Sequence, residues 1–449
     1  MRTIPLSYAL ETVPRYTSYP TAAQFHDRIG ETEARAWMAG LDPASPLSLY
    51  VHVPYCRVLC WYCGCHTSVL NDDARIARYA ARLIHEAEIL AQAAGSAGPV
   101  KHLHFGGGTP TILAPEDFRR LVQHLRTLFG FRPDAEIAVE IDPRTLDETM
   151  VDAMATAGVN RVSLGIQDMN PDVQRHVNRI QPLDVVERAF AFLRGAGIER
   201  INVDLMYGLP GQSVADVRAS VDAMLALRPD RAAVFGYAHV PWFKKNQEAI
   251  DASLLPGAAE RILQAQAAAE AFGHAGWAAV GFDHYARPDD AMAIAAAAGT
   301  LKRNFQGYTT DDAEVLLGLG ASSIGSLPSG YIQNEPHLGK WAQAIDAGRL
   351  SIVRGVAVTR DDAVRRTVIE ALMGAFRVDL AAIIAQNGLA DGYFDQALDN
   401  LAPLEADGLC AIEGQTVTVP EAARFHVRNV AARFDAYWAP SAARHSRAV

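Results

Sequence analysis

The chain has 449 residues, of which 50% are hydrophobic, 8% aromatic and 20% charged. A chain this apolar buries enough surface to offset the conformational entropy of folding, which excludes a mainly disordered protein. The 51 acidic and 41 basic residues leave a formal net charge of −10. This charge argues against a nucleic-acid-binding protein, because a polyanion would be repelled. Any anionic ligand therefore needs a local basic pocket.

No apolar segment predicts a membrane span. The longest run of small apolar residues, Met292 to Ala298, is far shorter than the ~20 residues that cross a bilayer, and the N-terminus lacks a signal-peptide core. Four of the five cysteines fall within ten residues, a spacing that favours an intracellular metal or cluster site over disulfides. We expect a cytoplasmic monomer that binds no membrane and no nucleic acid.

Short β-branched runs predict six strands along the chain. Two intervening segments carry apolar residues at steps of three and four and predict helices. The first covers Ile76 to Leu90 behind a cap at Asn71 or Asp72, and the second covers Phe118 to Leu128 before Gly130. The predicted strands are Leu47 to Val53, Lys101 to Phe105, Glu136 to Ile141, Arg161 to Ile166, Arg200 to Met206 and Arg231 to Val240.

This alternation of strands and helices predicts an α/β fold. Six repeated units with a parallel sheet favour an open three-quarter (β/α)6 barrel. We expect residues 1–45 to form an N-terminal extension over the barrel mouth. We expect residues 46–355 to form the catalytic domain, with the partial barrel over 46–250 followed by a further segment. From about Asp361 the pattern changes to short helices and a hairpin, which predicts a smaller, mostly helical C-terminal domain over 356–449.

Polar residues and glycines follow the predicted strands at equivalent places. In such barrels the chemistry gathers at the C-terminal ends of the strands. A single glycine turn or carboxylate is often only structural, but six such places together indicate one active site. They are the cysteine loop, Gly106 to Thr109, Glu140, Gln167, Asp204 and Tyr237 to His239.

Three cysteines lie on one short loop in the spacing Cys56-x3-Cys60-x2-Cys63. Three thiolates hold three irons of a [4Fe–4S] cube and leave the fourth iron without a protein ligand, and soft thiolates also suit zinc. A zinc site needs a fourth ligand, for which the sequence offers only Cys65 or the adjacent histidine. A four-cysteine cluster closed by Cys65 or Cys410 is also compatible with the spacing.

The cysteine motif, with Tyr62 just before its third cysteine, resembles that of radical S-adenosylmethionine (SAM) enzymes. Over essentially its whole length, the chain resembles the oxygen-independent coproporphyrinogen III oxidases. The segments that carry this resemblance are Cys63 to Cys65, Pro14 to Thr21, Glu140 to Pro143, Gly165 to Asp168, Val177 to Arg179, Asp204 to Pro210, Asn304 to Thr310 and Thr359 to Asp362.

The resemblance implies a [4Fe–4S] cluster held by Cys56, Cys60 and Cys63, with Cys65 beside them as an accessory residue. The open iron then chelates the amino and carboxylate groups of SAM. We interpret Cys410, which stands apart, as a small buried hydrophobe.

The resemblance also implies two SAM molecules, one on the cluster and one beside it. Among the matching positions, Asp204 and Gln167 suit ribose hydroxyls, and Arg179 suits a carboxylate. The implied cofactor-binding residues are Tyr50, Tyr62, Gly107, Gly108, Thr109, Glu140, Gln167, Arg179, Asp204, Ala238, Phe305, Gln306 and Ile324.

The implied reaction is the oxidative decarboxylation of two propionates of coproporphyrinogen III to vinyl groups. It gives protoporphyrinogen IX in haem biosynthesis and uses a 5′-deoxyadenosyl radical, an electron donor for the cluster and a terminal electron acceptor, neither of them identified. Arg15 and Arg57 are candidates to bind the substrate carboxylates. The alternatives are a haem carrier or a radical tetrapyrrole methyltransferase. The carrier is disfavoured because such relatives usually lack the fourth cysteine and the N-terminal motif.

Overall fold

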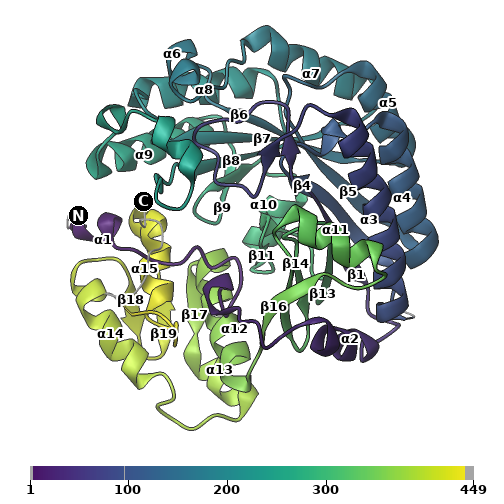
Figure 1. The fold of residues 1–449 in the computed structure, drawn as a ribbon. Coiled ribbons are helices and arrows are strands. Elements are labelled where there is room, and N and C mark those ends of the chain that lie inside the picture. Colours follow the sequence, from purple (N-terminus) through teal and green to yellow (C-terminus); the bar gives the residue numbers. More distant parts are fainter. Residues whose placement is uncertain (1–3, 96, 440–449) are drawn as a thin grey trace.

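The computed structural model describes residues 4–95 and 97–439. The centre of this part of the chain is a twelve-stranded mixed sheet that curls into an open three-quarter barrel (Figure 1). The six predicted strands are confirmed and run parallel to one another. They are β1 (Leu47–Val53), β4 (Val100–Gly107), β5 (Phe131–Ile141), β6 (Arg161–Gln167), β7 (Arg200–Tyr207) and β8 (Arg231–Gly236).

The last of these strands is shorter than predicted. β8 ends at Gly236, opposite Tyr207, because its neighbour β7 ends there and offers no further pairing. The next residues, Tyr237 to Val240, leave the sheet and line cavities at the barrel mouth.

The sheet extends beyond the six predicted strands at both edges. On one side β13 (Val315–Leu319) pairs parallel with β1, and three antiparallel strands follow it. On the other side two short antiparallel strands follow β8. The added strands are β14 (Ile324–Leu327), β15 (Gly330–Asn334), β16 (Ile352–Ala357), β10 (His284–Ala286) and β9 (Ala278–Val280).

Helices cover the outer face of the parallel strands (Figure 1). Their ends follow the sequence signals: the Asp72 carboxylate accepts a hydrogen bond from the Arg75 backbone N–H at 3.1 Å, and Gly130 ends a helix at φ 63°. These helices are α3 (Asp73–Ala94), α4 (Pro115–Phe129), α5 (Glu148–Ala157), α6 (Pro171–His176), α7 (Leu183–Gly195), α8 (Val214–Ala226) and α9 (Ala258–His274).

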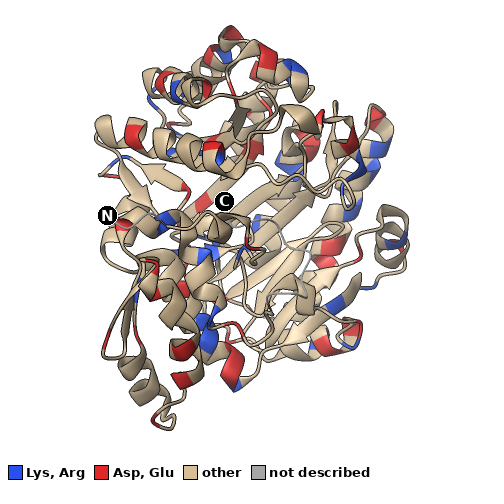
Figure 2. Ribbon diagram, turned by 90° about the vertical axis from the view of Figure 1, so that its left-hand side faces the viewer, with Lys and Arg blue, Asp and Glu red and all other residues tan. Residues whose placement is uncertain are grey.

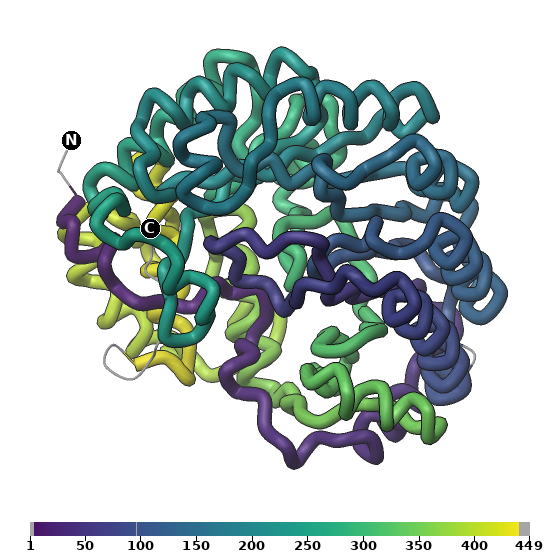
Figure 3. The backbone as a smooth tube through the Cα atoms, turned by 45° about the horizontal axis from the view of Figure 1, so that its top comes forward, coloured from purple at the N-terminus to yellow at the C-terminus, as the bar shows by residue number. Residues whose placement is uncertain are grey.

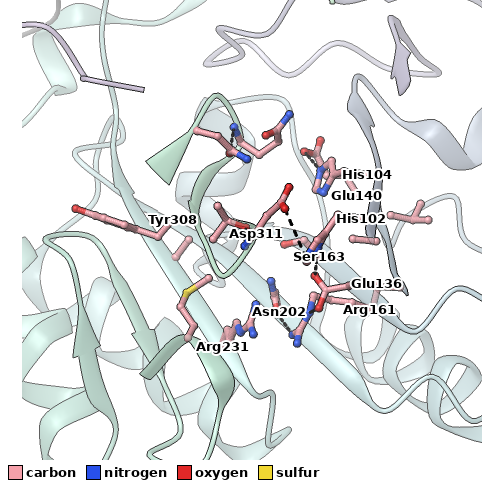
Figure 4. Close-up of a pocket in the computed structure, with 18 of the residues that line it drawn as sticks. His102, His104, Glu136, Glu140, Arg161, Ser163, Asn202, Arg231, Tyr308 and Asp311 are labelled. Carbon is pink, nitrogen blue, oxygen red and sulfur yellow. Dashed lines mark hydrogen bonds and ion pairs between the residues drawn. The ribbon is translucent and has the colours of Figure 1, made fainter. Parts of the chain in front are cut away.

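Side chains of the parallel strands alternate between two environments. The odd positions of β1 and β4, such as Leu49, Leu103 and Phe105, are buried in the core beneath the helices. The even positions point into the barrel, because successive strand residues face opposite sides. A cavity of about 240 Å³ there has a polar lining (Figure 4), and in it Arg161 Nε donates to Glu136 Oε2 at 2.9 Å. The barrel interior therefore contains paired polar and charged side chains beside apolar ones and is not a purely apolar core.

The C-terminal region has its own hydrophobic core, in which Cys410 is buried. The predicted hairpin is confirmed as the antiparallel pair β18 and β19. The elements are α12 (Arg360–Ala375), β17 (Arg377–Asp379), α13 (Leu380–Asn387), α14 (Asp395–Ala406), β18 (Ala411–Glu413), β19 (Thr416–Thr418) and α15 (Val427–Ala432). Four more helices complete this description: α1 (Ser7–Leu10), α2 (Glu31–Ala39), α10 (Ala291–Ala297) and α11 (Leu338–Asp346).

The N-terminal segment packs into this C-terminal core. Val13, Tyr16 and Tyr19 belong to it, and the Tyr16 hydroxyl donates to Asp435 Oδ2 at 3.1 Å. The two ends of the described chain thus lie side by side, as the purple and yellow segments of Figure 3 show. None of the helices in the described ranges is long and apolar enough to span a membrane.

Candidate active site

The cysteine loop follows β1 and lies at the C-terminal ends of the parallel strands. The side chains of Cys56, Cys60 and Cys63 line one cavity of about 670 Å³, which we call the cysteine cavity. Distant residues hold the loop in shape. The Asn246 amide donates to the carbonyl oxygens of Trp61 at 3.0 Å and Cys63 at 2.9 Å. The loop is therefore tied to a segment that lies far along the chain.

Hydrogen-bond donors surround the thiols. Arg179 Nη1 and Arg144 Nη2 lie 3.4 and 3.5 Å from the Cys60 sulfur, and the Thr109 hydroxyl donates to the Cys56 sulfur at 3.4 Å. A hydrogen bond with the Cys65 thiol lowers the pKa of Cys63 to about 7. The thiolate, which is the form that binds iron, is thereby favoured at Cys63, whereas burial raises the pKa of Cys56.

The two arginines are compensated by a buried carboxylate. Burial alone would raise the pKa of Asp142, but the charge of Arg179 and the hydrogen bonds of Arg144 outweigh it and lower that pKa. Arg179 is 6% exposed, so it is an interior residue and not part of a surface ion pair. Both Nη atoms of its guanidinium group lie 3.4 Å from carboxylate oxygens of Asp142.

The glycine segment after β4 packs against the cysteine loop. Gly108 N–H donates to the Val53 carbonyl at 2.8 Å, and Thr109 N–H donates to the Tyr55 carbonyl at 2.8 Å. A Cβ at Gly108 would lie 2.5 Å from the Thr67 hydroxyl oxygen and 2.6 Å from the Tyr55 carbonyl oxygen. Only glycine permits this approach.

Two carboxylates face the cavity from the middle strands. Glu140 accepts a hydrogen bond from the Gly107 N–H at 3.3 Å and lies 3.1 Å from His104 Nε2. Asp204 accepts from the Ser163 hydroxyl at 3.0 Å. Burial, together with the charge of Glu140, raises the pKa of Asp204 to about 6. Glu140, Ser163 and Asp204 also line the barrel interior, so the polar lining is continuous with the cavity in Figure 4.

The structure brings most of the implied cofactor residues together. Besides the three cysteines, the cysteine cavity is lined by Tyr62, Gly107, Gly108, Thr109, Glu140, Gln167, Arg179, Asp204 and Ala238. Phe305 and Gln306 instead line an adjoining cavity of about 710 Å³, and Ala238 lines both.

Two implied residues line neither of these cavities. The Tyr50 hydroxyl oxygen lies 3.0 Å from His52 Nδ1, below the glycine segment. Ile324 packs into the small apolar cluster that also contains Phe305. Arg57, the second candidate for a substrate carboxylate, forms an ion pair with Asp73 at 2.6 Å. The binding roles of all these residues stay predictions.

Three residues that contribute to the candidate active site were not predicted from the sequence. Arg144 stands two residues after Asp142, and its charge beside that carboxylate was an available signal. Ser163 lies two residues before Gly165 on the inward side of β6, which strand alternation shows. Asn246 lies far along the sequence from the cysteine loop, and no spacing rule connects them.

The fold and the cysteine loop define a class of protein. The sequence model of the Radical SAM superfamily matches residues 50–224, a stretch that includes all three cavity cysteines. The class is that of the radical SAM enzymes, which carry a [4Fe–4S] cluster and SAM.

Comparison with known proteins identifies the family within this class. The chain is 49% identical over 446 residues, 99% of each chain, to the oxygen-independent coproporphyrinogen III oxidase of Bradyrhizobium diazoefficiens. It is 40% identical over 427 residues to that of Escherichia coli, covering 94% of this chain and 93% of the relative. The solved structure of coproporphyrinogen III oxidase (HemN) from Escherichia coli, a radical SAM enzyme, matches with a TM-score of 0.90 at 38% identity, covering 94% of this chain and 98% of that chain. The chain belongs to the family of oxygen-independent coproporphyrinogen III oxidases.

Proposed function

We propose that the protein converts two propionates of coproporphyrinogen III to vinyl groups without oxygen and thereby makes protoporphyrinogen IX for haem biosynthesis. The observation that carries this proposal is the match, along nearly the whole chain, to relatives named for this oxidase activity. The cysteine cavity supports it, because it places three thiols beside polar groups suited to a cofactor.

The residues of the cysteine cavity fit a [4Fe–4S] cluster. Three thiols line one cavity, and Arg144 and Arg179 beside Cys60 would offset the negative charge that ligating thiolates bring. In this proposal Cys56, Cys60 and Cys63 are the ligands. When bound, the cluster and SAM supply a 5′-deoxyadenosyl radical, which removes a hydrogen atom from the β-carbon of a propionate.

The protein contributes binding and orientation. The close-packed backbone of Gly107 and Gly108 would hold the methionine end of SAM, and Thr109 would add a hydroxyl. Asp204 and Gln167, on neighbouring strands, are suited to ribose hydroxyls. Strand ends and the cysteine loop line the cavity together, and they would hold the cofactor in one orientation for the radical chemistry.

The reaction balance requires partners that the chain does not supply. Each propionate loses carbon dioxide, one hydrogen atom and one electron as the vinyl group forms. An electron donor must therefore reduce the cluster, and a separate acceptor must take the electron that the substrate releases. We propose a cytoplasmic location, because clustered reduced thiols persist in reducing compartments, and a monomeric state.

We propose three structural units for this activity: an N-terminal extension over 1–45, a catalytic domain over 46–355 and a C-terminal domain over 356–449. Separate hydrophobic clusters in the barrel and in the C-terminal region support this division. The extension joins the two, since it packs into the C-terminal core and lines the barrel mouth.

An anaerobic assay tests the proposed reaction. Reconstituted protein with SAM, a reductant and coproporphyrinogen III is expected to give a product that has lost the mass of two formic acid molecules. The physical reason is that each propionate loses carbon dioxide and two hydrogens overall. Mass spectrometry separates the alternatives: an added methyl group would indicate a methyltransferase, and bound, unchanged haem would indicate a carrier. Either result would contradict the oxidase.

The second SAM molecule is also part of this proposal. Phe305 and Gln306 form the turn of the hairpin between β11 (Lys302–Asn304) and β12 (Gly307–Thr309), on the cavity that adjoins the cysteine cavity. A cofactor beside the cluster-bound one would meet this turn. Gln306 offers an amide that both donates and accepts hydrogen bonds.

Replacing Gln306 by Ala is expected to weaken one of two SAM sites several-fold, since a lost hydrogen bond costs ~0.5–1.5 kcal/mol. Anaerobic equilibrium binding should count two SAM molecules per wild-type chain and leave the cluster iron content of the variant unchanged. Gln343→Ala, at an exposed position of α11, is the matched control. One SAM per wild-type chain would refute the second cofactor and leave the radical mechanism standing.

A further inference from the structure

Four arginines from distant parts of the sequence meet around one cavity. Arg15 in the N-terminal segment, Arg261 on α9, Arg303 on β11 and Arg428 on α15 line the cavity of about 710 Å³ that adjoins the cysteine cavity. We call it the arginine cavity. Cys65 lines both cavities, so a ligand in one lies next to the other. Figure 2 shows basic positions between the sheet and the C-terminal helices as well as on the outer surface.

The arginine cavity carries an excess of positive charge. Asp283 is the sole carboxylate among its described lining residues, although the chain as a whole has a net charge of −10. That carboxylate is already engaged, because His284 Nδ1 lies 2.7 Å from its Oδ1 and Arg303 Nη1 lies 4.0 Å away. One carboxylate shared in this way does not neutralise both Arg15 and Arg303.

Individual arginines retain capacity to bind a ligand. The Arg303 side chain is 7% exposed, and its Nε and Nη1 have no hydrogen-bond partner among the described residues. Arg15 faces the cavity with its side chain exposed and makes no side-chain hydrogen bond to the described part of the chain. Buried donors without partners are costly, so a ligand that accepts hydrogen bonds is favoured here.

Aromatic rings hold the guanidinium groups in place. The Arg303 guanidinium lies 4.4 Å from the ring centroid of Tyr308 and 5.1 Å from that of Phe282. Arg428 lies 5.7 Å from the ring of Phe282. Stacking on aromatic faces fixes the orientation of the fork without neutralising its charge. Burial and the nearby charges of Arg15 and Arg303 lower the pKa of Arg428 to about 10, as expected where like charges gather.

We propose that the arginine cavity binds carboxylate groups, and that these are propionates of the porphyrinogen substrate. This inference rests on the proposed function and deepens it. A planar guanidinium fork matches a carboxylate in bidentate geometry. The methionine carboxylate of a second SAM has the same chemistry, but one carboxylate needs far fewer cations than this cavity offers. The substrate carries four propionates, so those that are not reacting at the cysteine cavity remain available to the arginines.

Equilibrium binding to the intact, cluster-reconstituted protein tests the inference. The probes are coproporphyrin III, the oxidised tetracarboxylate, its uncharged tetramethyl ester, and SAM. Arg15→Gln and Arg303→Gln each remove a charge-assisted hydrogen bond, so the Kd for coproporphyrin III is expected to rise about tenfold to a hundredfold. The affinity and stoichiometry of SAM and the iron content should not change. The tetramethyl ester should bind weakly to every variant. Arg188→Gln, at an exposed position of α7, should behave as wild type.

Two results overturn the inference. Wild-type affinity for coproporphyrin III in both arginine variants shows that the cavity does not anchor the substrate. Weakened SAM binding with unchanged coproporphyrin III binding assigns the cavity to the cofactor instead. Both results differ from a failure of the proposed function. If the proposed function is wrong, the wild-type protein itself forms no vinyl product. The Arg15 side chain is exposed, so Arg15→Gln is expected to leave the protein folded and loaded with iron. A change in its binding then reports on the cavity.

Discussion

Replacing Cys56, Cys60 or Cys63 by Ala is expected to abolish the [4Fe–4S] cluster and the activity together. Each would supply one of only three protein ligands, and a cube held by two thiolates is not retained. Cys65→Ser is expected to keep the cluster, because Cys65 neighbours Cys63 without being one of the three in the motif, and to lower turnover. Iron and sulfide content per chain and the visible absorbance of the cluster measure the difference.

Cys410→Ala is the matched control for these variants. This cysteine is 4% exposed in the C-terminal core, far from the cysteine loop in sequence. Its variant should keep full iron content and lose only the small stability contribution of a buried sulfur. Loss of the cluster in Cys65→Ser as complete as in Cys60→Ala would contradict an open iron and would favour a cube closed by four cysteines.

Gly108→Ala has the next largest expected effect. The added methyl group would lie 2.5 Å from Thr67 Oγ1 and 2.8 Å from the backbone nitrogen of Tyr55, so the glycine segment and the cysteine loop must separate. Overpacking of this kind costs ~1–3 kcal/mol. SAM affinity should fall about fivefold to a hundredfold if that cost is paid on binding. Equilibrium SAM binding measures the loss of affinity, and thermal unfolding measures the loss of stability.

A glycine in open space provides the comparison. Gly195 lies at the end of α7, and a Cβ built there meets no atom within 4 Å. Gly195→Ala is expected to leave SAM binding unchanged and to stabilise the helix by up to ~1 kcal/mol. Equal SAM affinity in Gly108→Ala and wild type would show that the close approach of the two loops is not needed for the cofactor.

Local signals were sufficient for the parallel strands and for much of the cysteine cavity. The strand of Leu47 to Val53 was predicted with its observed bounds, and Gly130 ends its helix as expected. The residues after each strand converge because parallel strands end at the same edge, so Glu140 and Asp204 could be grouped without a structure. Once a parallel barrel is inferred, residues that follow its strands can be assigned to the same edge of the sheet.

The remaining features depend on tertiary packing that no local pattern encodes. The hairpin around Phe305 has strands of only three residues, too short for a periodic signal. Asn246 lies in a short 3-10 helix, Lys245–Ala249, which has no periodic apolar pattern. Arg303 and Arg428 stand in different structural elements, and a lone arginine in a sequence usually indicates a solvated surface residue. Their gathering around one cavity follows only from how the C-terminal helices meet the barrel.

The N-terminal segment contacts residues near the C-terminal end of the described chain. These contacts can form only late in synthesis. The Trp438 indole donates to the Thr12 carbonyl at 3.1 Å, and Asn429 Nδ2 donates to the Tyr8 carbonyl at 3.0 Å. At translation rates of ~5–20 residues per second, the N-terminal segment waits on the order of tens of seconds for these partners to emerge from the ribosome. During that interval the residues of the parallel barrel strands and of the cysteine loop have been synthesised, whereas Arg428 has not. The lining of the cysteine cavity, which in the described chain comes from residues no later than Gln247, is therefore synthesised well before Arg428, which lines the arginine cavity.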